Sequence, residues 1–167
     1  MSEPQPPSGP GAWITRLSGV EERLVALARE GASDGLTEPD PGGTERWRDV
    51  EVWAHLGEFP DYWVDQLSAV VGGRGGKAVP FGRTRADPAR TAAVAAARRD
   101  DIAGHLRRLL GACDRLRALF ATMDDADWAA RGAHPSLGEM DVPSILQEFL
   151  IGHLEQHAAQ LEALHGR

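Results

Sequence analysis

Residues 141–164 read DVPSILQEFLIGHLEQHAAQLEAL, and this stretch is the strongest indicator of the fold class. Its apolar side chains recur every three or four residues, which is the spacing of one face of an α-helix. Asp141 is suited to cap the start of that helix. The predicted inward stripe contains two histidines among apolar residues: Val142, Ile145, Leu146, Phe149, His153, His157, Leu161 and Leu164.

The same periodicity predicts three more helices, over residues 13–30, 45–71 and 88–122. Pro60 is expected to kink the second of these. Residues 32–44 and 124–140 are rich in turn formers and are predicted to be connections, with little sign of strand. The sequence therefore predicts an all-α four-helix bundle. The Gly-rich connection after Val71 is long enough to cross the end of a bundle, so the second and third helices need not be antiparallel neighbours.

Composition and charge narrow the classes of function. The 167 residues suit one domain, predicted over residues 12–167, after a flexible tail rich in Pro, Ser and Gly at residues 1–11 that does not resemble a signal peptide. The sequence contains no run of 18 apolar residues, so no membrane span is predicted. The net charge of −7 argues against nucleic acid or anionic lipid as a partner. Cys113 is the single cysteine, which excludes an internal disulfide and suits a reducing cytoplasm.

Three histidines form the candidate functional site. His153 and His157 have the i, i+4 spacing that stacks two side chains on one helix face, and His55 lies in the apolar stripe of the second helix. A lone histidine is ordinarily a surface or hydrogen-bonded residue. Two unpaired imidazoles in a core, however, would cost about 1–3 kcal/mol each. A shared metal ion removes this cost, and three protein ligands leave coordination positions open for chemistry.

Other metal chemistries fit less well. The sequence lacks a His-Glu-x-x-His motif and a Cys-x-x-Cys pair. A di-iron bundle needs two Glu-x-x-His motifs, and only residues 162–165 have that spacing. The remaining histidines do not join the predicted set: His105 flanks its stripe, His134 is in a connection, and His165 is expected in a fraying C-terminus. A mononuclear site is therefore predicted.

Two residues of the second helix are candidates for orienting a metal-bound water or moving a proton. Glu58 lies one turn after His55, and Tyr62 lies two turns after it. The alternatives are an ordinary solvated residue for Glu58 and an amphipathic residue at the core edge for Tyr62. Cys113 is predicted to be a small core residue and not a nucleophile.

The chain resembles the DinB superfamily. The resemblance rests on Trp47, Glu51 and Ala54-His55-Leu56, followed by Asp127-Trp128, Gly138, the pair of His153 and His157, and Gln160-Leu161. It spans roughly residues 12–165. Arg48 departs from the pattern, because many members have a Ser or Thr there that caps the second helix, and this leaves the start of that helix open.

The resemblance implies an up-down-down-up bundle that binds one divalent ion, usually zinc or nickel, and a homodimer. Its characterised members include thiol S-transferases, mycothiol-dependent maleylpyruvate isomerase and metal-dependent hydrolases. Mycothiol is favoured because the single lysine among eighteen basic residues indicates a GC-rich genome, as in many actinobacteria. Arg74, Arg83 and Arg85 are candidates for binding the carboxylate of an anionic thiol, although such a loop is more often simply polar.

The expected function is therefore that of a metal-dependent transferase acting on a small thiol and an electrophilic substrate. Two alternatives stay open. One is a metal-dependent hydrolase of amides or esters, and the other is a stress-induced metal-binding bundle without turnover. Transfer requires a thiol, hydrolysis proceeds without one, and a binding protein does neither.

Overall fold

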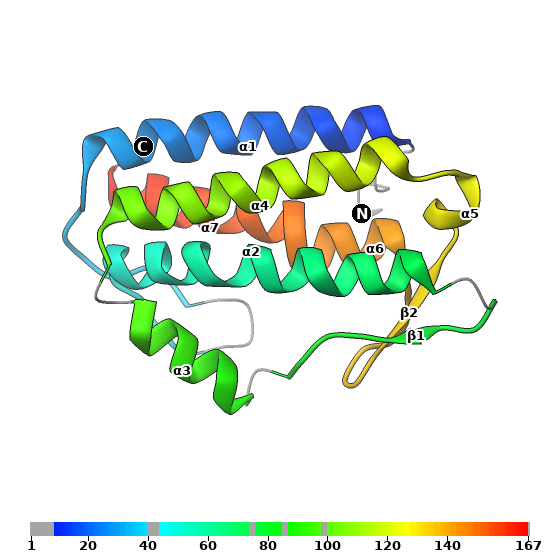
Figure 1. Cartoon of the computed structure of the whole chain (residues 1–167). Coiled ribbons are helices and arrows are strands. Elements are labelled where there is room, and N and C mark those ends of the chain that lie inside the picture. The colour runs from blue at the N-terminus through cyan, green and yellow to red at the C-terminus, as the bar shows by residue number, and fades with distance from the viewer. Residues whose placement is uncertain (1–8, 40–43, 74–75, 85–86, 98–99, 167) are drawn as a thin grey trace, which may run out of the picture.

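The computed structural model describes residues 9–39, 44–73, 76–84, 87–97 and 100–166. Four long helical segments pack around one apolar core, and a small three-stranded sheet covers one end (Figure 1). In chain order the elements are α1 (Pro10–Glu30), α2 (Asp49–Gly72), β1 (Val79–Pro80), α3 (Pro88–Ala97), α4 (Ile102–Thr122), α5 (Asp125–Trp128), β2 (Arg131–His134), β3 (Gly138–Asp141), α6 (Val142–Ile145), the π-helical turn η1 (Leu146–Leu150) and α7 (Ile151–Leu164). The predicted all-α four-helix bundle is confirmed.

The directions of the four segments follow from contacts between them. Arg16 and Arg23 of α1 pair with Glu155 and Glu162 of α7, and both partners advance by seven residues, so α1 and α7 run parallel. Figure 1 shows α2 and α4 parallel to each other and opposite in direction to α1. The bundle is therefore up-down-down-up. The connection from residue 73 to 101, which carries β1 and α3, makes this arrangement possible because it returns the chain to the end where α2 began.

The first two helices begin at other residues than predicted. α1 begins at Pro10, so residues 10 and 11 belong to a helix and not to the predicted tail; residues 1–8 of that tail lie outside the described part. α2 begins at Asp49 and not near Glu45, and the Glu51 carboxylate accepts a hydrogen bond from the backbone N–H of Arg48. The N–H of Glu51, which a Ser or Thr side chain at position 48 would bind, instead donates to the backbone oxygen of Arg48.

The predicted helix over residues 88–122 is in fact two helices. α3 is Ala-rich and lies beside α2, outside the four-helix core (Figure 1). α4 has a new start, because the Asp101 carboxylate accepts a hydrogen bond from the N–H of Gly104 at 2.7 Å. An aspartate at this position caps a helix and also ends the preceding one. Periodicity alone did not reveal this break.

The last connection and the last helix also contain more structure than expected. Residues 124–140 include α5 and the antiparallel pair of β2 and β3, and β1 adds to β2 in parallel. Predicting little strand was therefore wrong for these short segments. The expected helix over residues 141–164 is interrupted by η1, one π-helical turn of five residues.

We expect the close approach of α2 and α4 at Gly57 to be a sensitive point of the fold. A Cβ atom at Gly57 would lie 2.5 Å from Nδ1 and 3.1 Å from Cα of His105. Gly57→Ala is expected to lower the free energy of unfolding by about 1–3 kcal/mol, because overpacking forces the helices apart. Urea denaturation measures this difference.

Gly111→Ala in α4 is the matched control, since a Cβ there meets nothing within 4 Å. It should raise the free energy of unfolding by about 0.5–1 kcal/mol, the usual gain of alanine over glycine in a helix. Equal effects of the two substitutions would contradict the proposed close packing at Gly57.

Candidate metal centre

The structure brings together the three histidines that the sequence predicts to converge. His55 lies in the second turn of α2, and His153 and His157 lie one turn apart in α7. Nε2 of His153 is 3.2 Å from Nε2 of His55 and 3.1 Å from Nε2 of His157. His55 and His157 are buried, while His153 is half-buried. The cluster therefore lies at the border between the core and solvent.

The spacing of the nitrogens fits a shared metal ion. With Zn–N bonds near 2.0–2.1 Å, two nitrogens on one ion lie about 2.9–3.4 Å apart, from octahedral to tetrahedral angles. The observed 3.1 and 3.2 Å fall in this range. A neutral imidazole has one N–H, so Nε2 of His153 cannot donate fully to both neighbours. Three convergent neutral nitrogens suit zinc, nickel, copper or iron better than magnesium or calcium.

His157 is held in the orientation and tautomer that a ligand needs. Its Nδ1 lies 2.7 Å from Oε1 of Gln160, one turn further along α7. Because an amide oxygen only accepts, Nδ1 carries the proton and the Nε2 lone pair faces the cluster. Trp47 stacks on the His157 ring at 6.3 Å between centroids and meets the His55 ring edge-on at 5.2 Å.

His55 is kept neutral by its surroundings. Burial lowers the pKa of His55 well below 6.5, and the neighbouring His157 and His153, followed by the positive charges of Arg90 and Arg83, lower it further. Its Nδ1 is buried with no hydrogen-bond partner among the described residues. A buried, neutral imidazole is the form that binds a metal ion.

Glu58 and Tyr62, the two predicted accessory residues, lie in a polar contact group with Arg83. The Glu58 carboxylate forms an ion pair with Arg83, and both side chains are about nine-tenths buried. The Arg83 guanidinium also lies 4.0 Å from the centre of the Tyr62 ring. Burial raises the pKa of Tyr62 above 10, so its hydroxyl stays protonated at neutral pH. These contacts leave the predicted roles in proton transfer untested.

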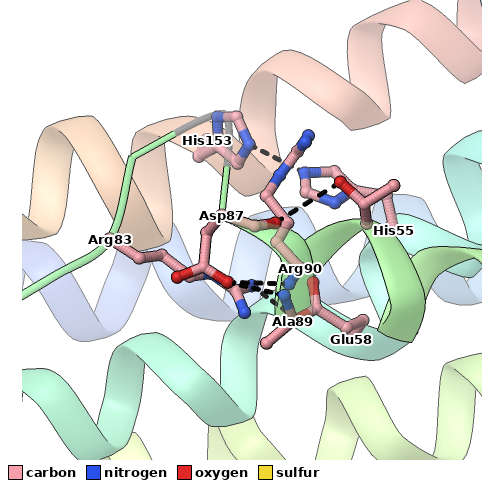
Figure 2. Close-up of polar contacts among 8 residues, drawn as sticks. His55, Glu58, Arg83, Asp87, Ala89, Arg90 and His153 are labelled. Carbon is pink, nitrogen blue, oxygen red and sulfur yellow. Dashed lines mark hydrogen bonds and ion pairs between the residues drawn. The ribbon is translucent and has the colours of Figure 1, made fainter.

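Figure 2 shows Glu58 and Arg83 of this contact group beside the start of α3. The Asp87 carboxylate accepts hydrogen bonds from the N–H groups of Ala89 and Arg90 and so caps the start of α3. Arg83 reaches Glu58 from the connection that leads to α3. The start of α3 therefore lies over the side of α2 that carries His55. Arg74 and Arg85, the other two predicted anion-binding arginines, lie outside the described residues.

Cys113 is confirmed as a core residue. Its side chain is 2% exposed, and burial raises the pKa of its thiol to about 12. A thiol with this pKa is protonated at physiological pH, and only the thiolate is a strong nucleophile. The chain itself therefore offers no activated cysteine.

The other described histidines have separate environments, as the sequence indicates. His105 is buried against Gly57, and Nδ1 of His134 accepts hydrogen bonds from the N–H groups of Ser136 and Leu137. His165 was expected in a fraying terminus, and this expectation is wrong. It lies 3.4 Å from the buried Asp49 carboxylate and anchors the end of α7.

The DinB superfamily model matches residues 16–161. The chain belongs to the DinB superfamily. This match covers most of the chain and contains the whole histidine cluster. No curated protein matches the chain by sequence.

Three solved structures are similar to this chain in fold. YfiT from Bacillus subtilis, described as a probable metal-dependent hydrolase with an unusual four-helix bundle topology, aligns with a TM-score of 0.74 and 20% identity, over 99% of this chain and 93% of its own. A mycothiol-dependent maleylpyruvate isomerase aligns with a TM-score of 0.70 and 10% identity, over 92% of this chain and 60% of its own. An uncharacterised protein from Clostridium difficile 630 aligns with a TM-score of 0.68 and 7% identity, over 97% and 98% of the two chains. At these identities the likeness shows the fold, and the isomerase has substantial chain beyond the shared part.

Gln160 is the site residue whose role the sequence analysis missed. It was recognised as part of a family signature but not as the partner of His157. The signal was present, since residues three apart in a helix face each other.

None of the described helices is both long and apolar enough to cross a membrane.

The lowered pKa of His55 predicts a pH dependence of stability in the metal-free protein. The unfolded chain binds more protons at this residue than the folded protein does, so the free energy of unfolding should fall as the pH drops below 6.5. In His55→Leu this loss should be smaller. Urea denaturation of chelator-treated protein at several pH values measures both slopes, and identical slopes would contradict the assigned cause.

Proposed function

We propose that this protein binds one divalent metal ion through His55, His153 and His157 and uses it in a thiol-dependent transfer reaction. The observation that carries the proposal is that Nε2 of His153 lies 3.2 Å from that of His55 and 3.1 Å from that of His157, with the ligand atoms of all three histidines within 4.8 Å of one another. Zinc or nickel are the ions we expect, since imidazole nitrogen suits both.

The donor set favours a reactive site over a structural one. Three protein ligands leave at least one coordination position open, and a bound ion would supply Lewis-acid activation of a thiol or of water there. His153 is the most exposed of the three histidines, so the open side lies toward it. The chain contributes orientation, because Gln160 fixes His157 and Trp47 packs against its ring.

The nucleophilic sulfur would come from a small cosubstrate and not from the chain. Cys113 is buried and protonated, which leaves an external thiol as the source. Mycothiol is favoured by the arginine-rich composition, and the structural likeness to a mycothiol-dependent isomerase supports it. The second substrate would be an electrophile. We propose a cytoplasmic location, because mycothiol or a similar small thiol would be available to the protein there. No nucleic-acid or membrane partner is expected, and a homodimer remains a proposal from the family.

Glu58 and Tyr62 are proposed to act indirectly. The Glu58 carboxylate neutralises Arg83 beside the cluster, and this ion pair shapes the electrostatic environment of His55. Tyr62 keeps its proton and is suited to donate a hydrogen bond, not to serve as a base. An incoming anion that competes with Glu58 would meet Arg83 at this point.

Metal-dependent hydrolysis is the second candidate function. It is favoured by the similarity to YfiT, described as a probable metal-dependent hydrolase, which extends over nearly the whole of both chains. The same three-histidine cluster would serve it, with water in place of the thiol. The two functions differ in whether a thiol is required.

The proposed ligands predict the metal content of variants. Wild-type protein should bind about one divalent ion per chain, and alanine at His55, His153 or His157 should each remove most of it, because two imidazoles hold the ion far less tightly. Elemental analysis after dialysis measures the stoichiometry. His165→Gln, outside the cluster, is the matched control and should retain the metal. Full metal content in His157→Ala would refute the ligand assignment.

The proposed reaction predicts a dependence on thiol and metal. Transfer to an electrophile such as an activated aryl halide or a maleyl compound should require both mycothiol and the metal, and chelation should stop it. Cys113→Ala should retain most of the activity, whereas His153→Ala should lose it by at least about 100-fold. Turnover without thiol would favour the hydrolase, and metal binding without turnover on any substrate would favour the non-catalytic bundle. Activity that survives complete metal removal would contradict both enzymatic functions.

A further inference from the structure

The buried positions of the last helical segment change register between its two halves. In the first half the buried residues include Val142, Ile145 and Leu146, which are three or four apart. In the second half they are Ile151, Leu154, His157, Ala158 and Leu161. The step from Leu146 to Ile151 is five residues, and Leu150 between them is buried as well. A continuous α-helix cannot keep both sets on one face, because each residue turns the helix by about 100°.

The π-helical turn accounts for this step. η1 spans Leu146–Leu150 and contains one residue more than an α-helical turn. Leu150 departs from helical dihedral angles, with φ of −124° and ψ of −95°, directly before α7 begins. The extra residue rotates α7 by about 100° relative to α6, and this rotation brings Ile151 and Leu154 into the core.

The same rotation moves the histidine pair off the centre of the buried stripe. In an uninterrupted α-helix, His153 and His157 would continue the stripe of Leu146 and Phe149, and both would point into the middle of the core. In the structure Leu154 and Ala158 occupy that position, with 1% and 0% exposure. His153 lies on the flank, half-buried and with its Nε2 3.2 Å from that of His55, while His157 stays buried.

Gly152 is the residue that permits this turn. A Cβ atom at Gly152 would lie 2.1 Å from the backbone oxygen of Gln147 and 2.3 Å from its side-chain Nε2. The oxygen belongs to the residue five positions earlier, which is the spacing of a π-helical turn. Backbone cannot move away as a flexible side chain can, so any residue other than glycine would force the turn to open. Gly152 directly precedes His153.

We propose that η1 and Gly152 are positioning elements of the metal centre, which turn the His153 and His157 pair from the middle of the core toward His55, with His153 on the solvent side. This inference rests on the proposed metal binding by the three histidines. Neither Gly152 nor the turn supplies a side chain to the three-histidine cluster. Their role is to set the direction of the two α7 ligands, and the geometry of the bound ion should report it.

The test compares Co²⁺ binding to the full-length wild-type protein and to Gly152→Ala. We expect the dissociation constant of Co²⁺ to rise by about 10- to 100-fold, as for residues that orient ligands. The visible absorption bands of bound Co²⁺ should also change, because they depend on ligand geometry. Gly111→Ala is the matched control, since its Cβ meets nothing within 4 Å, and it should bind Co²⁺ as the wild type does.

A double variant separates the backbone contact from the side-chain contact. Gly152→Ala combined with Gln147→Ala removes the side-chain clash but leaves the backbone oxygen in place, so binding should not recover. Full recovery would overturn the inference, as would Gly152→Ala with the affinity and spectrum of the wild type. If the wild type does not bind Co²⁺, the result would instead contradict the proposed metal binding by the three histidines.

A measurement on the wild type keeps the inference testable if Gly152→Ala does not fold. The π-helical turn should be present in the metal-free protein, because packing of α7 and not the ion produces it. Backbone chemical shifts of residues 146–152 in chelator-treated protein should therefore match those of the metal-loaded protein. A regular α-helix through these residues in the metal-free state would overturn the inference.

Discussion

Three imidazoles that converge on His153 are the constraint on which the rest of the structure depends. Nε2 of His153 lies 3.2 Å from Nε2 of His55 and 3.1 Å from Nε2 of His157. Neutral imidazoles at such distances cannot all satisfy one another by hydrogen bonds, and charged ones would repel. Burial and the positive charges nearby keep His55 neutral. The cluster is therefore costly by itself and becomes favourable when the three lone pairs share a cation. Gln160 and Trp47 hold the His157 ring in the direction that this sharing needs.

The bundle topology serves the same cluster. Because the chain crosses from the end of α2 back to the start of α4, α2 and α4 run parallel, and α7 fills the remaining place beside α1 and α2 (Figure 1). This arrangement brings His55 of α2 against the two histidines of α7, although 98 residues separate His55 from His153. The crossing segment then carries Arg83 and α3 to the side of α2 near His55. The connection thus contributes charge to the site as well as topology.

Much of this could be predicted from the sequence, and the failures have physical causes. The convergence of His55, His153 and His157 followed from their places in apolar helical stripes, while the helix directions came from the family resemblance. The register change at η1 was hidden, because His153 and His157 continue the apolar spacing of an ideal α-helix and a single glycine, Gly152, does not by itself indicate a π-helical turn. The break before α4 was hidden in an Ala-rich stretch with high helix propensity on both sides. The ion pair between Glu58 and Arg83 depends on where the connection before α3 places Arg83, and the hydrophobic periodicity of the helices does not predict this.

X-ray absorption spectroscopy of the zinc- or nickel-loaded protein tests the central claim most directly, because it counts the imidazoles around the ion. The account predicts three histidine nitrogens at about 2.0–2.1 Å, with the remaining positions filled by light atoms from solvent. Addition of the thiol cosubstrate should then introduce one sulfur at about 2.3 Å. A first shell with fewer than three imidazoles, or one unchanged in His153→Ala, would contradict a metal centre built from these three histidines.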